Sequence, residues 1–317
     1  MAGNKRAGYK LATYQTKEGP RAGLVIGEDV FDAARLTGKP AYGSVIGILA
    51  DWKRAEGALK KAAAGVAKSA VKSRAKRMPL GKTKLLAPVP NPPTIFCAGA
   101  NYADHAAAMA RKQGIPEPTD PREQGLKPWF FIKAAHTITD PGTTIKAKHY
   151  ADELDWEIEL AAVIGRPAKD VPKAKALNYV AGYTIANDLS ARDRGRRPGL
   201  EPTSIFKMDW TKHKSFDGSC PIGPWIVPAS DIADPQKLGL KLWVNGALKQ
   251  DSNTGQMLFT IAEQIAQLSI NMTLHPGDLI LTGTPAGTGG ESGKFLKTGD
   301  VVKLWIEGIG EFENRIA

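Results

Sequence analysis

The chain has 317 residues, of which 42% are hydrophobic and 24% are charged, the composition of an ordinary globular protein with one large or two modest domains. Two distant cysteines, Cys97 and Cys220, exclude a disulfide framework and a cysteine-rich zinc site, and they indicate a reducing, cytoplasmic location. No apolar run is long enough to span a membrane and no apolar signal core follows the N-terminus, so we expect no membrane partner.

The N-terminal segment combines short strands with a basic helix. β-like runs are expected at residues 9–14, 22–26 and 29–32, and an Ala- and Lys-rich stretch at residues 53–84 predicts a surface helix. The net charge of +11 arises here, because residues 1–86 contain 18 Lys and Arg against 6 Asp and Glu, whereas residues 87–317 contain 25 against 26. The basic stretch has no interleaved aromatic residues, so we interpret it as a solvated helix face and expect no nucleic-acid partner.

A proline-rich segment at residues 85–93 marks the predicted domain boundary. We expect a small basic N-terminal α+β domain at residues 1–87 and a catalytic domain at residues 88–317. The second domain shows short apolar strands and one clear helix at residues 260–268. The expected strands are residues 94–99, 129–132, 157–164, 179–187, 240–244, 278–283 and 301–306. Because strict βαβ alternation is missing, the pattern predicts a strand-dominated α+β fold with a mixed β-sheet roll or barrel.

A long segment rich in glycine and proline, residues 109–127, lies between candidate site segments. Loops of this length in compact domains are usually functional or irregular. The segment is interpreted either as a lid over the site or as an ordinary surface loop, and the sequence does not favour one interpretation over the other.

Glu157 and Glu159 form the most informative local pattern. With a period of two, they share one face of a predicted strand, while Trp156, Ile158 and Leu160 share the other. Paired carboxylates on a core strand repel each other, and a hard divalent cation that favours oxygen ligands would hold them together. The alternative is an edge strand with a solvated acidic face.

Five motifs occur in order along the chain. They are Asn101-Tyr102-x-x-His105, Asp155-Trp156-Glu157-x-Glu159-Leu160, Asp188-x-Ser190-Ala191-Arg192-Asp193, Lys214-Ser215-Phe216-Asp217 and Gly283-Thr284-Pro285-x-Gly287. Together they resemble the fumarylacetoacetate hydrolase family over most of residues 94–312. The resemblance implies a mixed β-roll catalytic domain, a homodimer, and a metal held by Glu157, Glu159 and Asp188. The metal is expected to be Mg²⁺ or Mn²⁺, with Ca²⁺ as a substitute in crystals.

The resemblance also implies roles for four further side chains. Lys214 matches the active-site lysine, which would pair with a substrate carboxylate or a developing enolate. His105 is the candidate general base that activates water. Thr284 lies in a turn whose donors would hold a substrate carboxylate. Arg192 is a substrate-binding candidate, although a structural ion pair with Asp193 is the favoured interpretation.

The main departure from the family pattern is Ala108. Many family members carry a glutamate three residues after the histidine, where it forms a water-activating pair with the imidazole. Because alanine cannot orient the imidazole, we expect one of two outcomes. Either a carboxylate of the possible lid, such as Glu117 or Glu123, replaces the missing glutamate, or the reaction depends less on water.

The leading hypothesis is a divalent-metal-dependent hydrolase that cleaves a C–C bond in a 2,4-dioxo acid, acylpyruvate-like or fumarylpyruvate-like, through a metal-stabilised enolate. The alternative is a decarboxylase, tautomerase, isomerase or hydratase of an oxaloacetate-like or 2-oxo-heptenedioate-like acid, because a metal-stabilised enolate can serve all of these reactions. A binding protein that uses the basic N-terminal segment is a third hypothesis, and the charged site residues argue against it.

Overall fold

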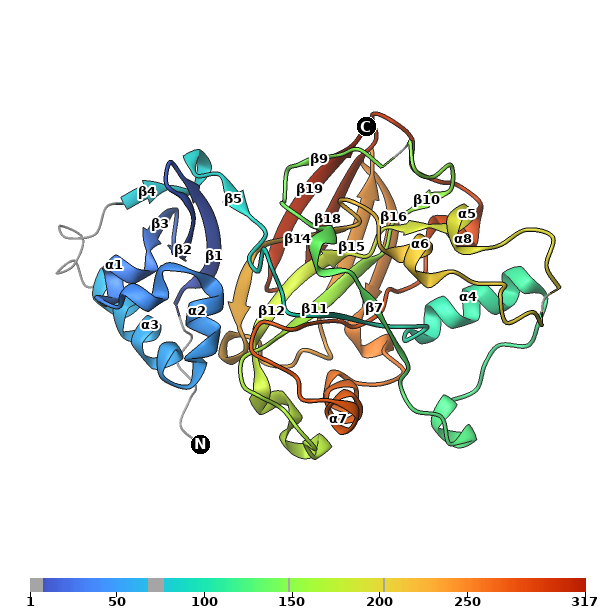
Figure 1. Cartoon of the computed structure of the whole chain (residues 1–317), viewed down its shortest axis with the longest axis horizontal. Helices are drawn as coiled ribbons and strands as arrows, with labels where there is room; N and C mark the ends of the chain where they lie inside the picture. Colours follow the sequence, from blue (N-terminus) through green and yellow to red (C-terminus); the bar gives the residue numbers. More distant parts are fainter. Residues whose placement is uncertain (1–7, 68–76, 148, 202) are drawn as a thin grey trace.

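The computed structural model describes residues 8–67, 77–147, 149–201 and 203–317. Figure 1 shows a smaller N-terminal part beside a larger part that contains the C-terminus. The described strands form a 12-stranded sheet, a 5-stranded sheet and a 2-stranded pair. None of the described helices is long and apolar enough to cross a membrane.

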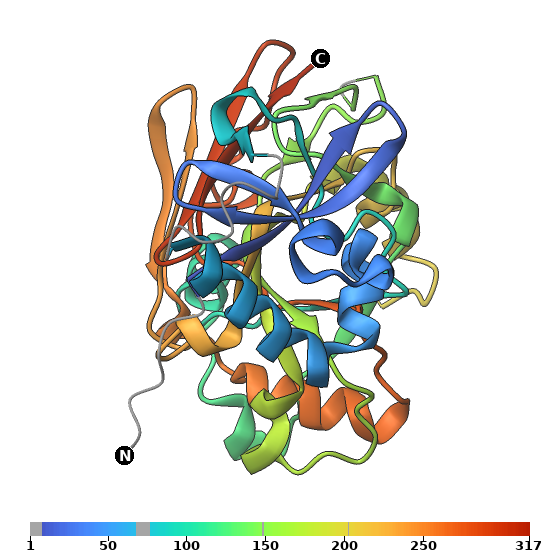
Figure 2. The same cartoon turned by 90° about the vertical axis from the view of Figure 1, so that its left-hand side faces the viewer.

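The N-terminal part packs helices on one side of a small antiparallel sheet (Figure 2). Its elements are β1 (Lys10–Thr16), β2 (Gly19–Ile26), β3 (Asp29–Asp32), α1 (Ala33–Thr37), the 3₁₀ helix η1 (Pro40–Gly43), α2 (Val45–Ala50), α3 (Trp52–Ala67), β4 (Arg77–Pro79), η2 (Leu80–Lys82) and β5 (Leu85–Leu86). The three predicted strands are confirmed.

The basic helix does not extend through the whole predicted stretch. It is described from Trp52 to Ala67, and residues 77–82 form β4 and a 3₁₀ turn, so the helical prediction is wrong at residues 77–82. Among the described strands, β4 pairs only with β3, at the edge of the sheet, where Pro79 is tolerated because an edge strand needs no second set of N–H donors. Residues 68–76 lie outside the described residues.

The larger part contains the remaining strands and helices, as follows. They are β6 (Ile95–Ala98), α4 (Ala103–Gln113), η3 (Pro121–Gln124), β7 (Phe130–Lys133), η4 (Ala135–Thr137), β8 (Ile138–Thr139), β9 (Thr144–Ile145), β10 (Leu154–Asp155), β11 (Ile158–Ile164), η5 (Lys173–Tyr179), β12 (Val180–Asn187), β13 (Ser190–Ala191), α5 (Arg192–Gly195), α6 (Trp210–Lys214), β14 (Cys220–Pro228), η6 (Ala229–Asp231), β15 (Gly239–Val244), β16 (Ala247–Asn253), η7 (Thr254–Gln256), α7 (Ile261–Asn271), β17 (Leu279–Leu281), α8 (Gly289–Ser292), β18 (Val301–Ile306) and β19 (Gly310–Ile316).

The sheets are mixed, as predicted. The main order of the large sheet is β4-β3-β2-β1-β14-β12-β11-β17-β6-β7, and the second sheet has the order β16-β15-β18-β19-β9. Most pairs are antiparallel, but β17 runs parallel to β6 and β19 runs parallel to β9. This architecture confirms the expected strand-dominated α+β fold. The boundary proposed at residue 87 stays a prediction, and β1 pairs with both β5 and β14, so the large sheet continues across it.

Strand β11 is buried on both faces, which places its carboxylates inside the protein. Ile158 and Leu160 belong to the core between the two sheets, whereas Ala161 and Val163 pack with the N-terminal helices. The strand lies between β12 and β17. The alternative of a solvated edge strand is therefore wrong.

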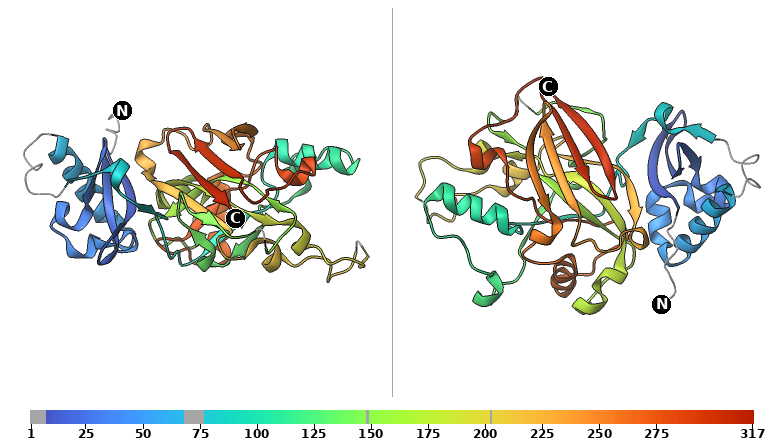
Figure 3. Two further views of the ribbon diagram at one scale, coloured as in Figure 1. Left: turned by 90° about the horizontal axis from the view of Figure 1, so that it is seen from above. Right: turned by 180° about the vertical axis from the view of Figure 1, so that it is seen from behind.

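The predicted lid segment begins as a helix. Helix α4 runs to Gln113, one short 3₁₀ turn follows at Pro121–Gln124, and β7 begins at Phe130. Figure 3 shows α4 and the loop between α5 and α6 at the end of the molecule remote from the N-terminal part. Helix α7, with Thr260 and Glu263 forming a capping box, confirms the predicted helix at residues 260–268.

Candidate active site

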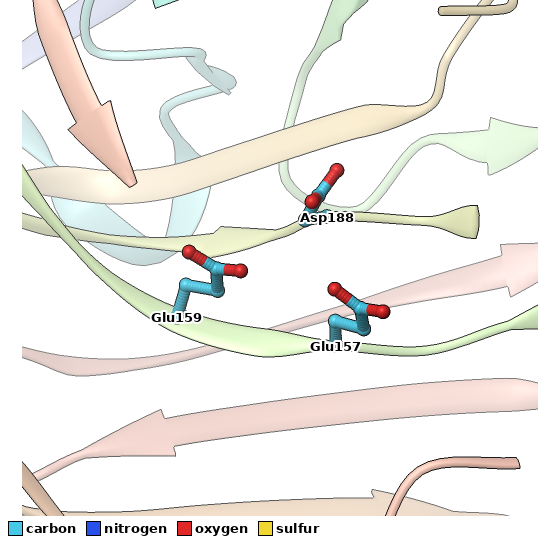
Figure 4. Close-up of side chains that lie close together, drawn as sticks. All are labelled: Glu157, Glu159 and Asp188. Carbon is cyan, nitrogen blue, oxygen red and sulfur yellow. The ribbon is translucent and has the colours of Figure 1, made fainter. Parts of the chain in front are cut away.

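Three buried carboxylates converge at the ends of two central strands. Glu157, Glu159 and Asp188 each offer an oxygen atom, and these atoms all lie within 4.8 Å of one another. Ile158 pairs with Asn187 in the antiparallel ladder, so the residue after β12 lies beside the start of β11. Figure 4 shows the three carboxylates directed toward a common space. The sequence therefore predicted a cluster that the structure brings together; its role as a metal site stays a proposal.

Two side chains hold the backbone of the Glu-x-Glu segment. The N–H of Glu157 donates to Oδ1 of Asn187 at 3.0 Å, and the N–H of Ile158 donates to Oε1 of Gln250 at 3.0 Å. Both acceptors are buried, so these side-chain oxygens replace the backbone carbonyl acceptors that a neighbouring strand would otherwise provide at this point. Nδ2 of Asn187 is also buried and has no hydrogen-bond acceptor among the described residues.

Two lysines neutralise part of the acidic cluster. Nζ of Lys214 lies 2.9 Å from Oε2 of Glu157 and 2.6 Å from Oδ2 of Asp188. Lys133, which is fully buried on β7, donates to Oδ1 of Asp188 and to the carbonyl oxygen of Leu189. Sequence reasoning missed Lys133, although a lysine at the buried end of an apolar strand is a signal in itself.

The charges of this cluster are unevenly compensated. Burial opposes ionisation of Glu157, but the positive charges of Lys214 and Arg192 hold its pKa below the usual range. Burial and the negative charges of Asp188 and Glu157 raise the pKa of Glu159 well above its usual value. The hydrogen bond that the N–H of Gly283 donates to Glu159, at 2.7 Å, does not offset this. A buried carboxylate that forms no ion pair with any described residue, next to two carboxylates that do, fits a hard divalent cation.

His105 has a carboxylate partner that the sequence did not reveal. Nδ1 of His105, on α4, lies 2.5 Å from Oε1 of Glu291, on α8. The second carboxylate oxygen of Glu291 accepts from the N–H of Gly287 at 2.7 Å, which fixes the orientation of the group. Glu291 thus supplies the carboxylate partner of the imidazole that Ala108 cannot supply. A role of the pair in activating water stays a proposal. The proposed lid substitution is wrong for Glu117, whose exposed side chain pairs with Arg111.

Placing a glutamate at position 108 tests this pairing. Ala108 lies one turn after His105 on α4, so a new carboxylate there would compete with Glu291 for the imidazole. Because Nδ1 already has a partner, Ala108→Glu is expected to change kcat/KM by no more than about twofold. Steady-state kinetics check this, and a gain of about tenfold would mean that Glu291 does not orient the ring.

Arg192 pairs with carboxylates other than the expected one. Its Nε lies 2.9 Å from Oδ2 of Asp155, and its Nη2 lies 2.5 Å from Oε1 of Glu157. The anticipated ion pair with Asp193 is therefore wrong, since the Asp193 carboxylate accepts instead from the backbone N–H of Glu153. A role of Arg192 in substrate binding stays a prediction.

Asp155 connects the acidic cluster to the segment that carries Glu291. Its fully buried carboxylate accepts from the N–H groups of Gly289 at 2.6 Å and Gly290 at 2.8 Å. A Cβ at Gly289 would lie 2.7 Å from Oδ1 of Asp155, so glycine is required for this close approach. The arrangement holds α8 beside Arg192 and aligns Glu291 with His105.

Thr284 lies at the site, but its hydroxyl is already engaged. Oγ1 donates to the carbonyl oxygen of Ile158 and accepts from Nε2 of Gln250, both at 2.9 Å. A substrate could still use the remaining lone pair or backbone donors of the turn. Its predicted role in substrate binding therefore stays a prediction.

Comparison with known proteins agrees with this architecture. Residues 94–317 match the family model described as fumarylacetoacetate (FAA) hydrolase, C-terminal. The chain is 40% identical over 253 residues to the mitochondrial oxaloacetate tautomerase fahd2 of Xenopus laevis, with 79% of this chain and 73% of the relative covered.

Solved structures show the same fold with related chemistries. Maleylpyruvate hydrolase from Sphingobium sp. SYK-6, in complex with manganese(II) ion and pyruvate, has a TM-score of 0.71 and 29% identity, covering 97% of this chain and 98% of that chain. The 2-hydroxyhepta-2,4-diene-1,7-dioate isomerase from Mycobacterium marinum has a TM-score of 0.69 and 32% identity, covering 98% of each chain. The chain described here belongs to the fumarylacetoacetate hydrolase family.

Proposed function

We propose that this protein is a divalent-metal-dependent hydrolase that cleaves a C–C bond in a 2,4-dioxo acid of the acylpyruvate or fumarylpyruvate type. The observation that carries the proposal is the His105–Glu291 pair beside the buried acidic cluster. The N–H groups of Gly289 and Gly290, on the same helix as Glu291, donate to Asp155. Arg192 joins Asp155 to Glu157, so a hydrogen-bonded network connects this helix to the carboxylates. A relative solved with manganese(II) ion and pyruvate supports the metal and the 2-oxo acid class.

Glu157, Glu159 and Asp188 would hold Mg²⁺ or Mn²⁺ through carboxylate oxygens. Such an ion would supply Lewis-acid polarisation of the 2-oxo and carboxylate oxygens of the substrate. Lys214 presents a buried cation to the same space, and the charges of Asp188 and Glu157 raise its pKa despite burial, so it stays protonated. Its charge would stabilise the enolate that forms as the bond breaks.

His105 would move the protons of the hydrolysis. It would take a proton from the water that attacks the distal carbonyl carbon, C4, while Glu291 holds the ring through Nδ1. Cleavage of the C3–C4 bond leaves its electron pair on the pyruvate fragment as an enolate. The proton held by His105 then passes to C3. The water oxygen ends in the released carboxylic acid, so atoms and charge balance.

Tautomerisation of an oxaloacetate-like acid is a second candidate. It is favoured by the relatives of about 40% identity that are named oxaloacetate tautomerases. The same His105–Glu291 pair would remove a proton from C3 and return it to the 2-oxo oxygen, with no water consumed.

The homodimer and the cytoplasmic location also stay predictions, and the animal relatives are named mitochondrial.

A substrate panel separates the two reactions. Acylpyruvates, fumarylpyruvate and oxaloacetate would be tested with Mg²⁺, with Mn²⁺ and with chelator, and products identified by NMR in H₂¹⁸O. We expect metal-dependent release of pyruvate, with ¹⁸O in the carboxylic acid product. Metal-dependent keto–enol exchange of oxaloacetate without cleavage of any dioxo acid would favour the tautomerase. Activity that survives complete metal removal would contradict both.

A further inference from the structure

An aromatic stack begins at the lysine of the acidic site. Nζ of Lys214 lies 5.2 Å from the ring centroid of Phe131. Phe131 stacks on Trp210 with centroids 5.2 Å apart and an interplanar angle of 20°, and Trp129 meets Trp210 edge-on at 5.5 Å. The stack therefore extends from the lysine toward the surface, between β7 and α6, which lie side by side (Figure 1).

The outer members of this stack are held in place but not covered. Trp129 is 45% exposed and Trp210 is 40% exposed. A Cβ at Gly99 would lie only 2.0 Å from the Trp129 ring, so the indole rests directly on the backbone of that glycine. Trp210 also stacks on His213, with ring centroids 5.5 Å apart. Two positioned and partly exposed indoles beside a reactive centre are suited to contact a flat apolar group.

An apolar cavity adjoins the stack. It has a volume of about 290 Å³ and lies between α4 and the segment of residues 118–127. Trp129 lines it together with Leu126, Leu258 and Phe259, and so does Ala106, the residue after His105. Lys127 is the only charged residue among the described residues that line it. The cavity thus has contact with both the aromatic stack and the helix of the catalytic base.

The geometry points to a subsite for the distal end of the substrate, selective for a planar apolar substituent such as an aryl group. This assignment rests on the proposed function, because it takes the 2-oxo acid end to lie at Lys214 and the carboxylates. The substituent would lie against Trp129 and Trp210 and extend into the cavity. A dioic acid would instead bring a second carboxylate to a cavity in which Lys127 is the only charged residue among the described lining residues.

A binding measurement tests the subsite without requiring turnover. Dissociation constants of phenylpyruvate and pyruvate would be measured by calorimetry on the Mn²⁺-loaded protein. The variants Trp129→Leu and Trp210→Leu remove the indoles. Ile132→Ala is the control, because Ile132 is 59% exposed but lies on the opposite face of β7 from Phe131. We expect phenylpyruvate to bind at least about tenfold more tightly than pyruvate in the native protein.

Each tryptophan variant is expected to reduce this preference by about tenfold, with pyruvate affinity unchanged within about twofold, and Ile132→Ala is expected to preserve it. Equal affinities in the native protein, or an unchanged preference in both tryptophan variants, would overturn the subsite. A change in oligomeric state with unchanged affinities would also overturn it, because the stack would then be an interface. Failure of the proposed function is distinguishable, since it would appear as no turnover of any dioxo acid while the binding preference persists.

Discussion

Replacing Glu159 by glutamine is expected to abolish divalent-metal binding and to lower kcat/KM by about 10³-fold or more, since Lewis-acid stabilisation supplies several kcal/mol. Glu159 is 2% exposed and, unlike Glu157 and Asp188, forms no ion pair with a described residue. Glutamine keeps its volume and can still accept from the N–H of Gly283. Calorimetric titration with Mn²⁺ and steady-state kinetics would measure both losses.

The same variant should leave the metal-free protein at least as stable as the native one. The raised pKa of Glu159 means that the folded state binds its proton more tightly than the unfolded state, so its contribution to stability falls as pH rises. Glutamine stays neutral at every pH, and at pH 8 its unfolding temperature without metal is expected to equal or exceed the native value. Glu123→Gln, on the exposed 3₁₀ turn, is the control and should retain metal binding. Retained metal affinity in Glu159→Gln would contradict the proposed site.

Replacing His105 by alanine is expected to lower kcat for C–C cleavage by about 10² to 10⁴-fold, the contribution typical of a positioned general base. Glu291→Gln is expected to lower kcat by about 10²-fold, because an amide cannot hold the imidazole as a carboxylate does. KM should change little in both variants, since neither residue belongs to the carboxylate cluster that would bind the metal and substrate. Steady-state and single-turnover kinetics with a dioxo acid would measure these effects.

The double variant tests whether the two residues act together. If Glu291 works only through the imidazole, His105→Ala with Glu291→Gln should be no slower than His105→Ala alone. Additive losses would show that Glu291 has a separate role. Mn²⁺ affinity should stay native in all three variants, which separates proton transfer from metal binding. Equal activity of His105→Ala and native protein would contradict the base assignment.

Much of the fold followed from short-range patterns. Short apolar runs predicted the strands at residues 157–164 and 301–306, and the Thr260 to Glu263 spacing is a local cap signal for α7. The wrong helical prediction for residues 77–82 arises because Arg77 and Lys82 continue the basic composition of the stretch before them. Their pairing with β3 depends on a partner nearly 50 positions earlier, which no local pattern encodes.

Part of the site could also be predicted, because it depends on residues that lie close together in the sequence. Glu157 and Glu159 lie two residues apart, so their shared face was visible in the sequence. Glu291 is separated from His105 by 186 positions and lies in a glycine-rich segment that reads as a turn. Gln250 occupies an ordinary strand position, and only the folded chain shows that it completes the hydrogen bonding of Ile158. The positions of Glu291 and Gln250 in the site depend on contacts between segments that lie far apart in the sequence, so no local pattern reveals them.

The most direct test is an anomalous difference map from crystals soaked with Mn²⁺ and pyruvate. We expect one strong peak between the carboxylates of Glu157, Glu159 and Asp188, with each residue contributing an oxygen at about 2.0–2.6 Å. Pyruvate density should lie between this peak and His105. A map with no peak at the three carboxylates, or with the only peak elsewhere on the chain, would contradict the proposed metal site.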